Sequence, residues 1–131
     1  MIIGREHYEK MLAHVQAEYP LEGCGLLAGI AGRVHHLYPV ANKLKSATAY
    51  EMDPRQQVAA MVEMEARGWE MTAVYHSHPQ GPETPSTTDV AQLYYQEAIQ
   101  VIVSLRERER PVVRAFRIEG ERVEEVPLLV V

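Results

Sequence analysis

The segment at residues 70–78, EMTAVYHSH, constrains the fold of this chain more than any other part of the sequence. Its apolar composition and its position between Gly68 and Pro79 predict a buried strand. Apolar runs of strand length also occur at residues 23–29 and 99–105. The chain is therefore expected to form a sheet that includes these three segments.

Turn signals add further strands to this sheet. Ala31-Gly32 resembles a hairpin turn that joins residues 23–29 to an antiparallel strand at residues 33–42. Residues 50–52 are a further candidate for a short strand. The early part of the chain thus predicts one antiparallel pair and one isolated strand.

Three segments have helical periodicity. Residues 5–19 predict an amphipathic helix. Asp53 as N-cap and Pro54 at the first helical position begin a second helix, which stops near Gly68. Residues 87–98 predict a third helix. The apolar positions that carry the three patterns are Tyr8, Met11, Leu12, Val15 and Tyr19; Val58, Met61, Val62 and Ala66; and Val90, Leu93, Tyr94 and Ala98.

The C-terminal part of the chain completes the predicted fold. Gly120-Glu121 separates two alternating segments, which predict a terminal hairpin. The apolar residues 127–131 pair either in the sheet or in a homodimer, and the sequence leaves that choice open. The fold class is therefore α/β, with a single mixed, largely antiparallel sheet flanked by about three helices. Residues 1–131 are expected to form one domain.

Composition and charge restrict the function. The net charge of −5 and a pI near 5.7 argue against a nucleic-acid-binding surface. Cys24 is the single cysteine, so no intramolecular disulfide can form. No signal peptide precedes the first helix, and no apolar run approaches the roughly 20 residues of a membrane helix. A cytoplasmic setting without membrane contact is expected.

His76 and His78 have the spacing of two metal ligands on one strand. Residues i and i+2 of a strand face the same side, about 6.6 Å apart, so two imidazoles can lean towards one zinc ion. Pro79 favours extended backbone at His78. Asp89 follows in the next helix and can supply a third ligand. Three protein ligands leave a fourth position for water, as in catalytic zinc sites.

A structural interpretation of the same residues stays open at this point. His-x-His pairs are common without metal, and Ser86 with Asp89 forms a plausible capping box at the start of a helix. Both interpretations can hold together, because an acidic ligand is favoured at a helix N-terminus. Glu22 lies at the mouth of the strand at residues 23–29. It is either a general base or a solvated loop carboxylate.

Two short sequences together resemble a known family. PLEGCGLLAG contains Glu22, and HSHPQGPETPSTTD contains His-x-His, an interval of seven residues, then Ser86 and Asp89. This pattern resembles the JAMM (MPN-plus) zinc metalloprotease motif, and the resemblance covers nearly the whole chain. It implies the MPN/JAMM fold, which has a cytidine-deaminase-like architecture. Zinc nucleobase deaminases themselves need H-x-E and P-C-x-x-C, which a chain with one cysteine cannot supply.

The resemblance assigns a role to each motif residue. It implies that His76, His78 and Asp89 ligate Zn²⁺, and that Glu22 takes the proton of the metal-polarised water and passes it to the leaving amine. It also implies that Ser86 stabilises the oxyanion. Ser77 is expected to face the other side of the strand in a structural role.

The chain is compact and is similar to the stand-alone prokaryotic members of the family. Those members include peptidases that act on the C-terminal tail of ubiquitin-like sulfur-carrier proteins. An extended tail could bind by adding a strand to the sheet. The alternatives are a deubiquitinase-like isopeptidase and a non-enzymatic MPN interaction scaffold. The sequence does not decide the carrier, the linear or isopeptide nature of the bond, or the pathway.

Overall fold

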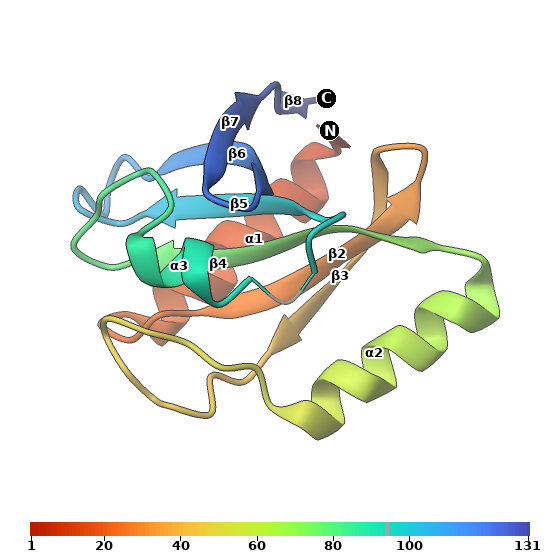
Figure 1. The fold of residues 1–131 in the computed structure, drawn as a ribbon, viewed down its shortest axis with the longest axis horizontal. Coiled ribbons are helices and arrows are strands. Elements are labelled where there is room, and N and C mark those ends of the chain that lie inside the picture. The colour runs from red at the N-terminus through yellow and green to blue at the C-terminus, as the bar shows by residue number, and fades with distance from the viewer. Residues whose placement is uncertain (94) are drawn as a thin grey trace.

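A computed structural model describes residues 1–93 and 95–131 of the chain. Within these residues, three α-helices flank one eight-stranded sheet of order β7-β6-β5-β4-β2-β3-β1-β8 (Figure 1). The elements are β1 (Ile2–Ile3), α1 (Arg5–Glu18), β2 (Cys24–Ile30), β3 (Arg33–Val40), α2 (Pro54–Arg67), β4 (Glu70–His78), α3 (Thr87–Ala91), β5 (Ile99–Ser104), β6 (Val112–Glu119), β7 (Arg122–Val126) and β8 (Leu129–Val130).

The sheet is mixed, as the sequence predicts. β4 and β5 run parallel, because the connection through α3 crosses over before it returns to the sheet. β1 is parallel to both β3 and β8, and the remaining pairs are antiparallel. β8 pairs with β1, so the apolar C-terminal segment lies in the sheet. The predicted fold class and both predicted hairpins are confirmed.

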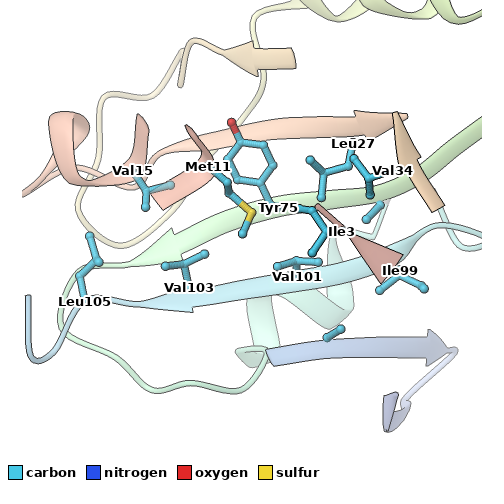
Figure 2. Packing of buried hydrophobic residues seen from close by; sticks show 12 residues of the cluster. Ile3, Met11, Val15, Leu27, Val34, Tyr75, Ile99, Val101, Val103 and Leu105 are labelled. Carbon is cyan, nitrogen blue, oxygen red and sulfur yellow. The ribbon is translucent and has the colours of Figure 1, made fainter. Parts of the chain in front are cut away.

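Successive side chains of β4 point to opposite faces of the sheet and pack into two different hydrophobic cores. Tyr75 belongs to the core under α1, where it packs with Met11 and Val15 of that helix (Figure 2). The neighbouring Val74 belongs to a second core on the opposite face, together with Cys24. Because successive strand residues point to opposite faces, His76 and His78 share the face of Val74. The sequence of β4 therefore directs its histidines away from α1.

α2 covers the second face and has the predicted ends. The Asp53 carboxylate accepts hydrogen bonds from the backbone of Arg55 and Gln56, both at 3.0 Å, and Pro54 opens the helix. Gly68 ends it in the left-handed conformation at φ 69°, where a side chain would be strained. Among the described residues, no helix is long and apolar enough to cross a membrane.

The predicted apolar face of α2 does not face the core. Val58, Met61 and Val62 are exposed, and the residues that the helix buries are Ala60 and Met64. Polar contacts explain this rotation about the helix axis. The Tyr38 hydroxyl donates to Glu63 at 2.9 Å, and Gln57 donates to the Tyr95 hydroxyl, so both polar residues turn inward.

Two other element predictions are wrong in extent. The third helix was predicted over residues 87–98, but α3 ends at Ala91, because the chain must leave the helical path to reach the start of β5. Tyr94, assigned to that helix by its spacing, lies outside the described residues. The candidate strand at residues 50–52 is reduced to one bridge between Met52 and Asn42.

Candidate metal centre

Three side chains converge on the face of β4 opposite α1. The Nε2 atoms of His76 and His78 lie 3.0 Å apart. His76 Nε2 is 3.1 Å from Asp89 Oδ1, and His78 Nε2 is 3.0 Å from Asp89 Oδ2. Both histidines are buried, with 1% and 5% of their surface exposed. Two imidazole nitrogens and a carboxylate that point at one another from adjacent elements form a donor set suited to zinc.

The loop between β4 and α3 brings Asp89 to the histidines. The Ser86 backbone donates to Asp89 Oδ2 at 2.8 Å, and the Asp89 backbone donates to Ser86 Oγ at 3.0 Å. This is the predicted capping box, and it holds the same carboxylate that lies against the histidines. His78 Nδ1 donates to the Pro82 carbonyl at 2.8 Å, which orients its Nε2 towards the cluster. The capping and metal-binding interpretations of Asp89 are thus compatible.

The electrostatics of the cluster favour an ionised Asp89. Burial opposes ionisation of this carboxyl, but hydrogen bonds with His76 and His78 hold its pKa well below the usual value. Burial lowers the pKa of His76, which keeps that imidazole neutral. Burial also opposes protonation of His78, yet its hydrogen bonds with Asp89 and the Pro82 carbonyl raise its pKa. An anionic carboxylate beside these imidazoles fits a divalent cation.

Glu22 faces this cluster from the segment that leads into β2. Cys24, the first residue of β2, pairs with His76, and the Glu22 carboxyl two residues earlier interacts with the charges of His78 and Asp89. It is only 4% exposed, and its Oε1 has no hydrogen-bond partner among the described residues. Burial raises the pKa of Glu22 to about 7. A buried, unpaired carboxyl with such a pKa is suited to proton transfer.

Asn42 holds the main chain around Glu22 and was missed by sequence reasoning. Its Nδ2 donates to the carbonyls of Glu22 at 3.1 Å and Ala49 at 3.0 Å. Its Oδ1 accepts from the backbone of Leu44 at 3.0 Å and Glu51 at 3.1 Å. These bonds join segments that are distant in sequence, so no local pattern could have indicated them.

Other neighbours of the cluster are structural or inert. Ser77 faces away from the histidines, and its Oγ accepts from the Gly23 backbone at 2.8 Å, which ties β4 to the chain beside Glu22. Tyr50 packs on His76 with ring centroids 4.5 Å apart, a contact without a sequence signal. Cys24 is fully buried, and burial raises the pKa of its thiol to about 12, so it is not a thiolate nucleophile.

A buried His-His-Asp cluster that faces a buried carboxylate is the type of site found in metal-dependent hydrolases. The profile of the family described as prokaryotic homologs of the JAB domain matches residues 4–119. The chain belongs to this family, which confirms the resemblance to JAMM proteins.

Known proteins support the assignment across the whole chain. The CysO-cysteine peptidase of Mycobacterium tuberculosis is 34% identical over 133 aligned positions, covering 100% of this chain and 91% of that protein. The probable TtuB-protein conjugate cleaving protease of Thermus thermophilus is 38% identical over 93 positions, covering 70% and 62%. The solution structure of a protein from Desulfitobacterium hafniense matches with a TM-score of 0.89 at 34% identity, covering 100% and 93%.

Proposed function

We propose that this protein is a zinc metallopeptidase that hydrolyses a peptide or isopeptide bond at the C-terminal tail of a ubiquitin-like, sulfur-carrier-type protein. Relatives named as a CysO-cysteine peptidase and a TtuB-conjugate cleaving protease support this class of substrate. One name gives a cysteine adduct and the other a protein conjugate, so we keep both a linear tail and a side-chain conjugate as candidates. Cys24, a lone reduced thiol, favours the cytoplasm as the place of reaction, and residues 1–131 are proposed to act as one domain.

Each residue of the cluster has a proposed task. His76, His78 and Asp89 hold the metal through two imidazole nitrogens and a carboxylate oxygen. Zinc, when bound there, supplies a Lewis acid and lowers the pKa of coordinated water. Glu22 accepts the proton of the attacking water and delivers it to the leaving amine.

Ser86 is proposed to donate its hydroxyl proton to the oxyanion. In the capping box its Oγ acts as an acceptor from Asp89, which leaves the O–H free to donate. The hydroxyl is also fixed in position by that bond. Ser86 can thus combine a structural and a catalytic task.

The observation that carries the proposal is the position of Glu22. The Glu22 carboxyl lies beside the cluster of metal-binding donors. Its Oε1 is buried without a hydrogen-bond partner among the described residues, and burial raises its pKa to about 7. A purely structural metal site has no use for such a carboxyl, because an unpaired buried polar atom costs about 1–3 kcal/mol. A scaffold protein likewise has no use for it.

The test is cleavage of ubiquitin-like proteins that carry C-terminal extensions, with the products measured by mass spectrometry. Glu22→Gln is expected to lower the rate by about 10²–10⁴-fold with one zinc still bound. Glu65→Gln, the same change at an exposed position of α2, is the matched control and should keep full activity. Asp89→Ala should lose zinc.

Two results would contradict the proposal. Full activity of Glu22→Gln would remove the general base. Zinc-free wild-type protein with undiminished stability and no cleavage of any tail would support the interaction scaffold instead.

A further inference from the structure

A cavity of about 390 Å³ opens beside the metal centre. It lies between the start of α2, the segment that carries Tyr50, and the chain after α3, and Asp89 forms part of its wall. Tyr50, another residue of the cavity wall, packs on His76. Two residues of the cavity wall, Tyr50 and Asp89, are therefore in contact with the metal cluster or part of it. A molecule bound in the cavity would therefore touch residues that contact the metal ligands.

Gln100 is the unusual residue in this cavity. It is 95% buried on β5, since only 5% of its surface is exposed, and it lines the cavity wall. No side-chain hydrogen bond joins its amide to any residue in 1–93 or 95–131. Because Gln100 lines the cavity, its amide can hydrogen-bond to an occupant.

The sheet register fixes how far Gln100 lies from the chemistry. Gln100 pairs with Val74, and the next pair on the same face is Ile102 with His76. Two residues along a strand correspond to about 6.6 Å. A substrate tail that runs extended along β4 and β5 advances by the same amount in two residues, so its residue about two positions from the scissile bond reaches the cavity.

The remaining walls define the chemistry of the occupant. Met52, Val74 and Leu93 supply apolar surface, and Gln100 offers an NH₂ group with two donor hydrogens and a carbonyl acceptor. Glu51 and Asp89 also line the cavity, which disfavours an anionic occupant. Glu51 already has Lys43 at 3.7 Å as a cationic partner. The volume lies within the roughly 300–1,000 Å³ of small-ligand sites and admits a large side chain with its peptide group.

We propose that this cavity is a specificity subsite that takes a bulky uncharged side chain of the substrate tail, about two residues from the scissile bond, and that Gln100 hydrogen-bonds to the peptide group of that residue. The proposal rests on the peptidase function proposed above. It adds the class of tail residue that the protein selects and the residue that selects it.

Gln100→Met tests the role of the amide, because methionine keeps the length and volume of the side chain. For the parent tail, kcat/KM is expected to fall about tenfold, while zinc content is unchanged. The melting temperature should stay the same, since the amide has no hydrogen-bond partner among residues 1–93 and 95–131 to lose. Gln96→Met, the same substitution at an exposed position before β5, is the control and should change neither quantity.

A series of tails tests the occupant. Each of the three residues on either side of the bond is varied in turn to glycine, leucine, phenylalanine, glutamate and lysine. One position should prefer leucine or phenylalanine and reject glutamate in the wild type, and this preference should weaken in Gln100→Met.

The outcomes separate the two proposals. Absence of cleavage of every tail by zinc-loaded wild type counts against the peptidase function itself. Cleavage without any side-chain preference, a preference for lysine, or an unchanged kcat/KM in Gln100→Met overturns the subsite while the peptidase function stands. A fall in melting temperature that accounts for the lost activity also overturns it, because Gln100 would then be structural.

Discussion

The two faces of the sheet differ in what their side chains do, although the same strands build both. On the α1 face, Tyr75 packs among apolar side chains (Figure 2). Its hydroxyl is hydrogen-bonded to His14 Nδ1 at 2.8 Å. On the opposite face, the next residue, His76, belongs to a buried polar cluster with Glu22 and Asp89. A cavity adjoins that cluster.

The difference indicates that one face of the sheet stabilises the fold and the other holds the reactive groups. The α1 face buries apolar surface and satisfies its polar groups, so it contributes stability. The opposite face holds Glu22 Oε1 buried without a hydrogen-bond partner among the described residues, which lowers stability. Alternation along β4 and β5 lets one rigid sheet support both, because residues one position apart face different environments.

The largest expected effect is on the α1 face. Met11 is fully buried there, so Met11→Ala should lower the free energy of unfolding by about 2–5 kcal/mol. Chemical denaturation of the zinc-loaded protein measures this change. The rate per folded molecule should be unchanged, since the substitution is on the other side of the sheet. A loss of kcat in fully folded protein would show that the two faces are coupled.

Ser86→Ala should mainly lower activity and should lower stability less. Loss of one oxyanion donor is expected to lower kcat by about 10²–10³-fold, equivalent to about 2.7–4 kcal/mol, with a smaller loss of stability from the broken cap. Steady-state kinetics and thermal unfolding measure the two parts. Asp53→Ala breaks the N-cap of α2 and is the control for capping alone. If both variants kept full kcat, Ser86 would only cap α3.

The loss of stability caused by the buried Glu22 carboxyl should depend on pH. Folding raises the pKa of Glu22 from 4.5 to about 7, so its contribution to stability is fully present below pH 4.5 and is lost as the pH rises through 7. Zinc-free Glu22→Gln should therefore be more stable than zinc-free wild type by roughly 1–3 kcal/mol at pH 8.

The same pair of proteins should differ little at pH 5, where the Glu22 carboxyl is mostly protonated in the folded state. Unfolding of chelator-treated protein at the two pH values measures this dependence. An equal difference at both pH values would mean that ionisation of Glu22 does not cause it.

The smallest effect is expected on the outer side of α2. Val62 is 62% exposed, so Val62→Ser should change the free energy of unfolding by less than about 0.5 kcal/mol. Met64, two residues later, is buried, and Met64→Ala should cost about 2–5 kcal/mol. Urea denaturation of both variants measures the contrast. A large loss for Val62→Ser would indicate that α2 buries the face predicted from periodicity.

Most of the fold could be predicted because its signals are local. The cap at Asp53, the turn at Ala31-Gly32 and the apolar run of β4 each act within a few residues. The orientation of α2 could not be predicted, since it depends on the contact of Glu63 with Tyr38 on another strand. The end of α3 also depends on a tertiary requirement, the crossover to β5.

For the site, the sequence by itself determined which residues are chemically competent and which of them share a strand face. The spacing of His76 and His78 and the capping pair of Ser86 and Asp89 are local geometry, and that geometry follows from backbone periodicity.

Only the tertiary structure decided which distant groups meet. It brings Glu22, just before β2, close to His78 at the end of β4, holds the Glu22 main chain through Asn42, and leaves Gln100 facing a cavity. The physical reason is that strand register and desolvation arise from packing between segments far apart in the chain, and these also set the pKa of Glu22.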